Sequence, residues 1–484
     1  MKPVSKSSFL KGIQCEKSLY LSIHFPKLAD PITERQQAIF DQGHEVQLEV
    51  EKRLFPGIHK LDLPPWKIHE SIQASLEALE KYKTIGEATF SRMLGTERLT
   101  ARVDIVEVID QKKIKIIEVK STTKVKPEHY MDLAFQAWIA LGAGFEVVSC
   151  ELIHINSECV FPNLENLFVR QDLSEKVKQT LGEIEAKANL FLNTLKQPEI
   201  PNVNVGAYCE NPNPCSFLGH CWQKIQRNSV LNLPKKYFNV WDLFSEGIVS
   251  VESISESELE GDLSKKIINA VKTNTRWVDR TEIKKEIRDW KKPFHHLDFE
   301  TLGFAIPKHK GAHPYQQIPF QFSCIVESDN SRTHFEFLSD SFFDEPMKDL
   351  LERLKTCIQK EGSIIAYNSN FEAAVLRLIA EALPDEKDLI ESWIQRLVDP
   401  LPVFRRAVYD PGFEGSYSIK AVAPAILGET HSYVGLEVRD GEQAQRAYLE
   451  YLHTKDVKIK KALLEYCHQD TEVMALLVKW LFEQ

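Results

Sequence analysis

Residues 103–120 read VDIVEVIDQKKIKIIEVK, and this stretch decides the fold class of the first part of the chain. Val and Ile dominate its two halves, and the pair Asp110-Gln111 separates them. This pattern predicts two β-strands, 103–109 and 113–119, joined by a tight turn. A predicted helix (132–141) and a further predicted strand (146–155) follow. We therefore expect a mixed α/β domain.

Three charged side chains on these strands form the first candidate site. Asp104 lies on the first strand, and Glu118 and Lys120 lie on the second. Because side chains alternate along a strand, Glu118 and Lys120 share a face, and Asp104 joins them if the strands pair as a hairpin. Two carboxylates beside one Lys are suited to bind Mg²⁺ or Mn²⁺ and to place a water beside a phosphodiester.

This arrangement resembles the core of the PD-(D/E)XK nucleases. The resemblance implies a restriction-endonuclease-like domain, with Glu87 on a possible preceding strand and Gln136 on the following helix as weaker companions. RecB-type nucleases of this class carry Gln-x-x-x-Tyr at that helix, whereas the fourth residue after Gln136 is Ala140. These nucleases also carry an early metal-binding His. His44 is either that ligand or a histidine on a helix surface.

Four of the nine cysteines form the second pattern. Cys15 precedes the predicted core, and Cys209, Cys215 and Cys221 follow it, each separated from the next by five residues in a loop rich in Asn and Pro. Four thiolates can hold a [4Fe–4S] cluster or Zn²⁺. Structural zinc usually has tighter Cys spacing, so the wider spacing favours iron–sulfur.

One cysteine before the core and three after it resemble the iron–sulfur staple of RecB-family nucleases of the AddB and CRISPR-associated type. The resemblance covers residues 1–225. It implies a cluster that ties together the two ends of the domain. The other five cysteines lie in apolar or helical surroundings, and we interpret them as packing residues: Cys150, Cys159, Cys324, Cys357 and Cys467.

A third pattern lies in the last part of the chain, where strands are predicted at 295–299, 317–326, 333–338 and 363–367. The sequence His296-Leu297-Asp298-Phe299-Glu300-Thr301 places two carboxylates on one face of a strand. Glu372 follows the sequence Tyr367-Asn368-Ser369-Asn370-Phe371 at the start of a predicted helix. Tyr466 and Asp470 share a face of the last predicted helix, because they are four residues apart.

In this order the motifs resemble the DnaQ-like (DEDD) 3′–5′ exonucleases of the Tyr subtype, which have an RNase H-like fold. The resemblance implies that Asp298, Glu300, Glu372 and Asp470 bind two divalent ions and that Tyr466 orients the attacking water. Glu372 departs from the family pattern, which has Asp there, so the carboxylate reaches one methylene further. Asp399 is either an additional outer acid or a helix or turn cap, and the cap is the favoured interpretation.

Composition narrows the classes of protein that fit. The chain has 484 residues and a net charge of −10, so it does not coat nucleic acid by bulk positive charge. Hydrophobic residues make up 43% and charged residues 27%, which is typical of a globular protein. No stretch is long and apolar enough to span a bilayer, and no secretory signal is recognised. We therefore expect a cytoplasmic protein without a disulfide framework.

The chain is predicted to contain three parts. Residues 1–228 form the PD-(D/E)XK domain with its cysteine cluster, and residues 293–484 form the DnaQ-like domain. Residues 229–292 read as short helices between them. This middle segment is either a solvated linker or a bridge that touches a phosphate backbone.

The combined resemblance is to an uncharacterised bacterial family that joins an iron–sulfur RecB-like module to a DnaQ-like module. It implies a metal-dependent nuclease that acts on nucleic acid, with DNA ends as the expected substrate and RNA left open. The alternative is a catalytically weak nucleic-acid-binding protein in which an iron–sulfur or zinc centre is structural. No P-loop motif of a helicase motor is found.

Overall fold

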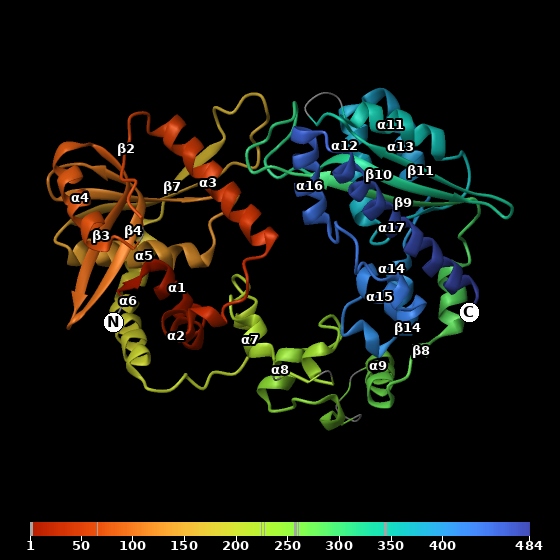
Figure 1. Ribbon diagram of the computed structural model, residues 1–484, viewed down its shortest axis with the longest axis horizontal. Helices are drawn as coiled ribbons and strands as arrows, with labels where there is room; N and C mark the ends of the chain where they lie inside the picture. Colours follow the sequence, from red (N-terminus) through yellow and green to blue (C-terminus); the bar gives the residue numbers. More distant parts are fainter. Residues whose placement is uncertain are drawn as a thin grey trace. The chain divides into compact units, whose positions relative to one another are not determined.

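The structure is a computed structural model that describes residues 3–64, 66–223, 225–226, 228–255, 259, 261–342 and 346–484. The chain forms two compact units, residues 1–224 and 225–484. Figure 1 shows that each unit contains both strands and helices. The predicted mixed α/β class is therefore confirmed.

The sheet of the first unit has the strand order β2-β3-β4-β5-β6-β7, and β1 pairs with β4. Strands β3, β4 and β5 form an antiparallel meander, and β5 and β6 run parallel because helix α5 connects them. The seven strands are β1 Val4–Ser5, β2 His59–Lys60, β3 Thr84–Leu94, β4 Glu97–Val108, β5 Lys113–Lys120, β6 Glu146–Ile155 and β7 Phe168–Asp172.

Helices pack against this sheet, and α5 and α6 supply much of the core. Ten of the sixteen residues of helix α5 are buried, including Phe135, which stacks on Phe9 of α1 with ring centroids 4.2 Å apart. The helices of this unit are α1 Lys6–Gln14, α2 Glu16–His24, α3 Glu34–Leu54, α4 Ile68–Lys81, α5 Pro127–Gly142, α6 Ser174–Lys196 and α7 Leu218–Trp222.

The main sheet of the second unit has the order β11-β10-β9-β12-β13. Its first three strands are antiparallel, whereas β12 and β13 run parallel to β9 and to each other. A separate pair, β8 and β14, is antiparallel. The strands are β8 Trp277–Val278, β9 Phe294–Leu302, β10 Ile318–Glu327, β11 Arg332–Leu338, β12 Ile364–Ile365, β13 Leu397–Val398 and β14 Val408–Tyr409.

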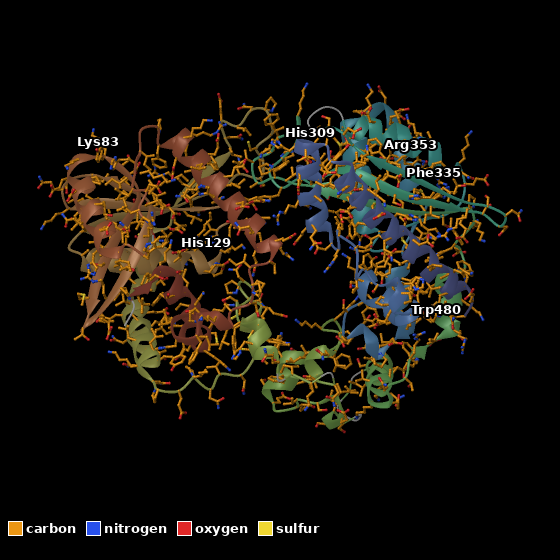
Figure 2. All side chains as sticks on the ribbon, in the orientation of Figure 1. Lys83, His129, His309, Phe335, Arg353 and Trp480 are labelled. Carbon is orange, nitrogen blue, oxygen red and sulfur yellow. The ribbon has the colours of Figure 1, made fainter. Side chains whose placement is uncertain are left out.

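The long helix α17 lies against β9 and β10 (Figure 1). Near its C-terminal end, Trp480 (Figure 2) stacks on Phe404 with ring centroids 6.1 Å apart. The helices of this unit are α8 Val240–Ser245, α9 Asp262–Thr273, α10 Arg280–Ile287, α11 Pro346–Cys357, α12 Asn370–Ala382, α13 Lys387–Ile394, α14 Pro400–Ala407, α15 Ile419–Leu427, α16 Gly441–Thr454 and α17 Val457–Phe482.

The predicted middle segment, residues 229–292, is not a separate part in the structure. It belongs to the second unit, because β8 pairs with β14 and α10 packs on α14. The boundary between the units also falls at residue 224 rather than at 228. Among the described residues, none of the helices has the length and apolar character required to cross a membrane.

Candidate functional site

The candidate site of the second unit is built from one strand and two helices. Asp298 and Glu300 lie on β9, and alternation along the strand places them on the same face. Glu372 lies in the first turn of α12, and Asp470 lies in the middle of α17. The loop after β12 and the long helix α17 therefore bring acids that are distant in sequence to the same region of the sheet.

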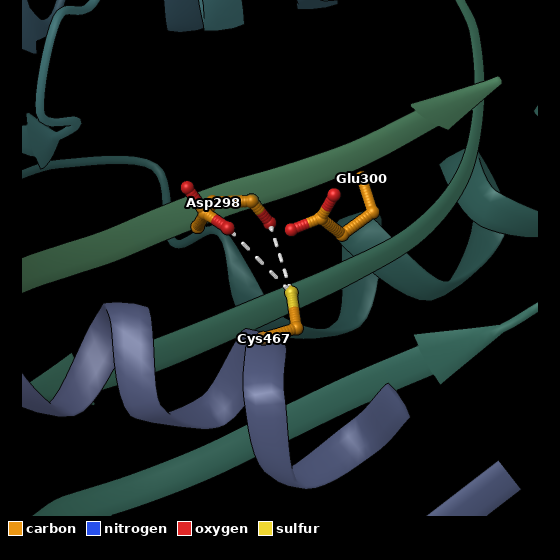
Figure 3. A group of neighbouring side chains, drawn as sticks. All are labelled: Asp298, Glu300 and Cys467. Atoms are coloured by element: carbon orange, nitrogen blue, oxygen red, sulfur yellow. Dashed lines mark hydrogen bonds between the residues drawn. The ribbon is translucent and has the colours of Figure 1, made fainter. Parts of the chain in front are cut away.

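Asp298 and Glu300 converge closely with a third side chain, Cys467 of α17 (Figure 3). One ligand atom from each of the three lies within 4.8 Å of the others. The thiol of Cys467 lies 3.7 Å from Oδ2 of Asp298. Among the described residues, these three make up the only His, Cys, Asp or Glu group gathered this tightly. The spacing suits ligands of one metal ion.

Glu372 and Asp470 lie outside that closest group but interact with it electrostatically. Both side chains are buried, and Oε2 of Glu372 has no hydrogen-bond partner among the described residues. Tyr433 donates a hydrogen bond to Oδ1 of Asp470. A buried carboxylate oxygen without a partner is costly, so Glu372 has an unmet demand for a cation or a proton.

Burial and mutual repulsion disfavour the ionised forms of these acids. Burial, together with the charge of Asp470, raises the pKa of Asp298 well above its usual value. Burial and the charge of Asp298 do the same for the pKa values of Glu300 and Glu372. Lys420 is the cation that opposes this effect at Asp298 and Glu300. Four carboxylates face one ammonium group, which is an imbalance that divalent cations would correct.

Three residues of this site were not singled out from the sequence. Cys467 was interpreted as a packing residue; it is fully buried, and its thiol also lies beside Asp298. Lys420 donates to the hydroxyl of Tyr466 over 3.1 Å, and its ammonium lies 5.1 Å from the ring centroids of Tyr433 and Tyr466. Cys467 stands inside the quoted Tyr466–Asp470 motif, but no local pattern marks Lys420 or Tyr433.

Asp399 has the role that the favoured interpretation gave it. Its carboxylate caps α14 by accepting from the backbone N–H of Leu401 over 2.8 Å. It also accepts from the N–H groups of Asn368 and Ser369, each over 3.0 Å. Asp399 therefore fixes the loop that leads to Glu372, and its oxygens are engaged by the backbone.

The acid cluster predicts an unusual dependence of stability on pH. Burial raises the pKa of Asp470 from 3.8 to about 6, although Tyr433 and Lys420 oppose the rise. The folded state thus binds a proton more tightly than the unfolded state, so Asp470 costs nothing below pH 3.8 and destabilises the fold as pH rises through about 6. In EDTA, we expect Asp470→Asn to match the wild type near pH 4 and to exceed its melting temperature at neutral pH.

Differential scanning calorimetry of the wild type and Asp470→Asn across this pH range measures the effect. The comparison cancels the titration of carboxylates that do not interact with Asp470. If the wild type and Asp470→Asn had equal melting temperatures at neutral pH in EDTA, ionised Asp470 would not destabilise the fold. Excess Mn²⁺ is expected to reverse the difference, because Asp470 then gains a cation.

The candidate site of the first unit has a different charge balance. Glu118 of β5 is buried, and both of its oxygens accept hydrogen bonds from Lys6 Nζ, over 2.9 and 3.0 Å. Lys120 donates to Glu118 over 2.6 Å and to Asp132 over 2.8 Å. Gln136 donates to Glu118 and Asp132 over 2.7 and 2.9 Å. Lys6 and Asp132 thus join the predicted residues here.

The pKa values of the two predicted carboxylates of this site are shifted in opposite directions. Ile105 of β4 pairs with Ile117 of β5, and Asp104 and Glu118 are the next residues of these two strands at the same end of the pairing. Burial raises the pKa of Asp104 to about 7, and the charge of Glu118 adds to the rise. Burial also acts on Glu118, but Lys120 and Lys6 outweigh it and lower the pKa of Glu118 well below its usual value.

The weaker companions are placed differently. Gln136 donates to Glu118 and Asp132, and Ala140 one turn later is buried in the core. Glu87 has a positive φ of 64° and pairs with Arg102 over 2.6 Å. His44 is exposed on α3, and in the described part of the chain no hydrogen bond or ion pair joins it to the carboxylates.

The four predicted cysteines meet in the first unit. Cys15, Cys209, Cys215 and Cys221 line one small cavity, and all four are free thiols. Burial raises the pKa of Cys209 to about 11, and the other three sulfurs add to the rise. Neighbouring contacts hold the two chain segments together, including Gln14, which donates to the carbonyls of Tyr208 and Asn213, each over 2.7 Å.

The spacing of these sulfurs bears on which metal they fit. In a tetrahedral zinc site with Zn–S bonds of about 2.3 Å, the sulfurs lie roughly 3.8 Å apart. No three of these four sulfurs, all within the described residues, lie within 4.8 Å of one another. Four thiols around a shared cavity are donors that can hold either Zn²⁺ or an iron–sulfur centre.

Comparisons with known proteins add little to this geometry. Residues 295–418 match the model of a domain of unknown function, DUF2779. This region includes Asp298, Glu300 and Glu372 but ends before Asp470. No curated protein matches the chain. Eight chains of solved structures match, among them "Crystal structure of SSO0001", which is 14% identical. That match covers 47% of this chain and 88% of the other, with a TM-score of 0.29.

Proposed function

We propose that this chain is a metal-dependent nuclease that hydrolyses phosphodiester bonds at DNA ends, with 3′–5′ exonuclease activity in the second unit. The observation that carries the proposal is the gathering of four carboxylates around one ammonium group. Asp298 and Glu300 come from a strand, and Glu372 and Asp470 come from two helices. The mixed sheet with its covering helices is compatible with the expected RNase H-like domain.

The side chains of the second unit have distinct tasks in this proposal. The four carboxylates would hold two divalent ions, Mg²⁺ or Mn²⁺, which would supply an activated water and neutralise charge at the phosphate. Tyr433 orients Asp470 through its hydrogen bond. The hydroxyl of Tyr466 accepts from Lys420, so its own proton is free to point toward a water or Asp470. Lys420 adds positive charge beside the scissile phosphate.

In the first unit, we infer a PD-(D/E)XK-type site and a [4Fe–4S] centre. Asp104 and Glu118 would hold a divalent ion, and Lys120 would orient water. Cys15, Cys209, Cys215 and Cys221 would hold the cluster. The meander β3-β4-β5, followed by α5 and the parallel strand β6, supports this assignment.

One observation favours a first unit that binds nucleic acid without cutting it. Both oxygens of Glu118 already accept hydrogen bonds from Lys6, Lys120 or Gln136. A metal ion at Glu118 must displace at least one of these donors. The variant Glu118→Ala separates the two roles, because it leaves cleavage unchanged if only the second unit is catalytic.

The proposal is tested with purified protein and single strands labelled at either end. With Mn²⁺, a 5′-labelled strand is expected to shorten stepwise, and a 3′-labelled strand is expected to release its label as a mononucleotide at once. EDTA should stop both reactions, since the carboxylates need cations. Cleavage that persists in EDTA, or products cut only internally, would contradict a metal-dependent 3′–5′ exonuclease.

A further inference from the structure

A cavity of about 680 Å³ lies within the second unit, next to the elements that carry the acid cluster. Its walls come from the start of the middle segment, the loop after β12, helix α14 and the loop before α15. The volume falls in the range of about 300–1,000 Å³ that is usual for ligand sites. Its polar and aromatic lining includes Lys235, Lys236, Arg405, Tyr367, Tyr417 and Ser418.

Positive charge dominates this lining. Lys235, Lys236 and Arg405 contribute three cationic groups, whereas Glu414 is the carboxylate among the lining residues. Within the described residues, no ion pair joins Lys236 or Arg405 to an acid. The ammonium of Lys236 lies 5.9 Å from the ring centroid of Tyr237. Cations without acidic partners around a concave surface favour an anionic ligand.

A buried, unpartnered hydroxyl lies at the same cavity. Tyr417 is only 7% exposed, and its hydroxyl has no hydrogen-bond partner among the described residues. The side chain of Tyr367 is held beside Tyr417, because the hydroxyl of Tyr367 donates to the carbonyl of Tyr417 over 2.7 Å. A buried hydroxyl normally finds a partner, so a ligand that accepts a hydrogen bond would satisfy Tyr417.

The cavity and the acid cluster share two structural elements. Tyr367 and Asn368 line the cavity and stand directly before α12, whose first turn carries Glu372. Ile419 lines the cavity, and the next residue, Lys420, donates to Tyr466 in the acid cluster. A polymeric anion that occupies the cavity would therefore extend along these elements toward the carboxylates.

We propose that this cavity binds the phosphodiester backbone of single-stranded nucleic acid and leads its end to the acid cluster. The inference rests on the proposed nuclease function and names the form of its substrate. Lys236 and Arg405 contact phosphate oxygens, and Tyr417 donates a hydrogen bond to the strand. Cations interleaved with aromatic rings are the usual means of holding a single strand without reading its sequence. The start of the middle segment thus forms part of the substrate site.

The test measures binding separately from cleavage. The full-length variant Asp298→Ala, which lacks a proposed metal ligand of the second unit, is titrated with fluorescein-labelled oligothymidylate by fluorescence anisotropy at several salt concentrations. The titration is done in EDTA, which withholds divalent cations from the proposed sites of both units. Lys236→Gln/Arg405→Gln is then added to this background. The matched control is Lys387→Gln/Arg288→Gln, which removes the same charges from side chains that are 62% and 73% exposed and do not line the cavity.

Two lost phosphate contacts should weaken binding about 10- to 30-fold at 0.1 M salt and lower the slope of log K against log salt by about 1.4. The control variant should lower neither the binding affinity nor the salt slope. Lys236→Arg/Arg405→Lys keeps both charges and should restore binding, which excludes misfolding as the cause. Unchanged affinity and salt slope in the Gln variant would overturn the inference. If that variant binds weakly while the parent protein never cleaves DNA, the cavity assignment stands and the nuclease proposal fails.

Discussion

Asp298→Ala is expected to reduce the metal-dependent exonuclease activity at least about 10³-fold. Asp298 belongs to the closest ligand group, with Glu300 and Cys467. Its charge also raises the pKa values of Glu300 and Glu372, so Asp298 interacts electrostatically with both of these acids. Ions bound by such carboxylates contribute several kcal/mol to transition-state stabilisation, and about 4 kcal/mol corresponds to 10³-fold in rate.

The same substitution should stabilise the metal-free fold. Removing one of four crowded carboxylates relieves repulsion that burial makes stronger. In EDTA, Asp298→Ala is therefore expected to melt above the wild type, whereas saturating Mn²⁺ should stabilise the wild type more than the variant. Glu336→Ala is the control and should change neither rate nor metal response, because Glu336 is an exposed side chain of β11, which β10 separates from β9. Full activity of Asp298→Ala would show that catalysis takes place at another site.

The sequence was sufficient to predict the elements whose pattern is strong over several residues. Strands β4 and β5 were predicted because Val and Ile dominate both segments. A last helix was predicted over 462–482, and the observed α17 begins five residues earlier. Helix α3 was missed because only Val46, Val50 and Glu51 are buried along its 21 residues, which leaves a mostly polar sequence. Strand β12 lies within the predicted strand 363–367. Strand β13 was missed because its two residues are too few to establish a period.

The acidic residues of the candidate sites could be found in sequence, but their partners could not. Carboxylates in Asp-x-Glu or Glu-x-Lys form local patterns. Lys6 reaches Glu118 across 112 positions, and Lys420 reaches Tyr466 across 46. Such contacts depend on how elements pack rather than on spacing along one element. The separate middle part, 229–292, was predicted wrongly, because its helix α10 packs on α14 and the segment belongs to the second unit.

Cys15→Ala is expected to remove the iron–sulfur centre and to destabilise the first unit severely. The variant should lose the visible absorption band and the bound iron and sulfide of the anaerobically purified protein. Cys15 and Cys209 are 194 positions apart, and joining them through a cluster closes a loop of that length. Cross-linking such a loop contributes about 5 kcal/mol by the chain-entropy relation, which is comparable to the whole stability of many domains.

Protein contacts near the cluster determine how far the unit unfolds without it. Gln14 donates to two carbonyls of the cysteine loop, and Asp30 accepts from the N–H of Gly219 over 2.9 Å. Each such bond adds about 1 kcal/mol, so together they offset only part of the loss. Limited proteolysis of Cys15→Ala should therefore cut residues 1–224 while 225–484 persists. Cys150→Ala, which removes a buried thiol of the same unit, should retain its iron. A colourless wild type that binds zinc would contradict the iron–sulfur assignment.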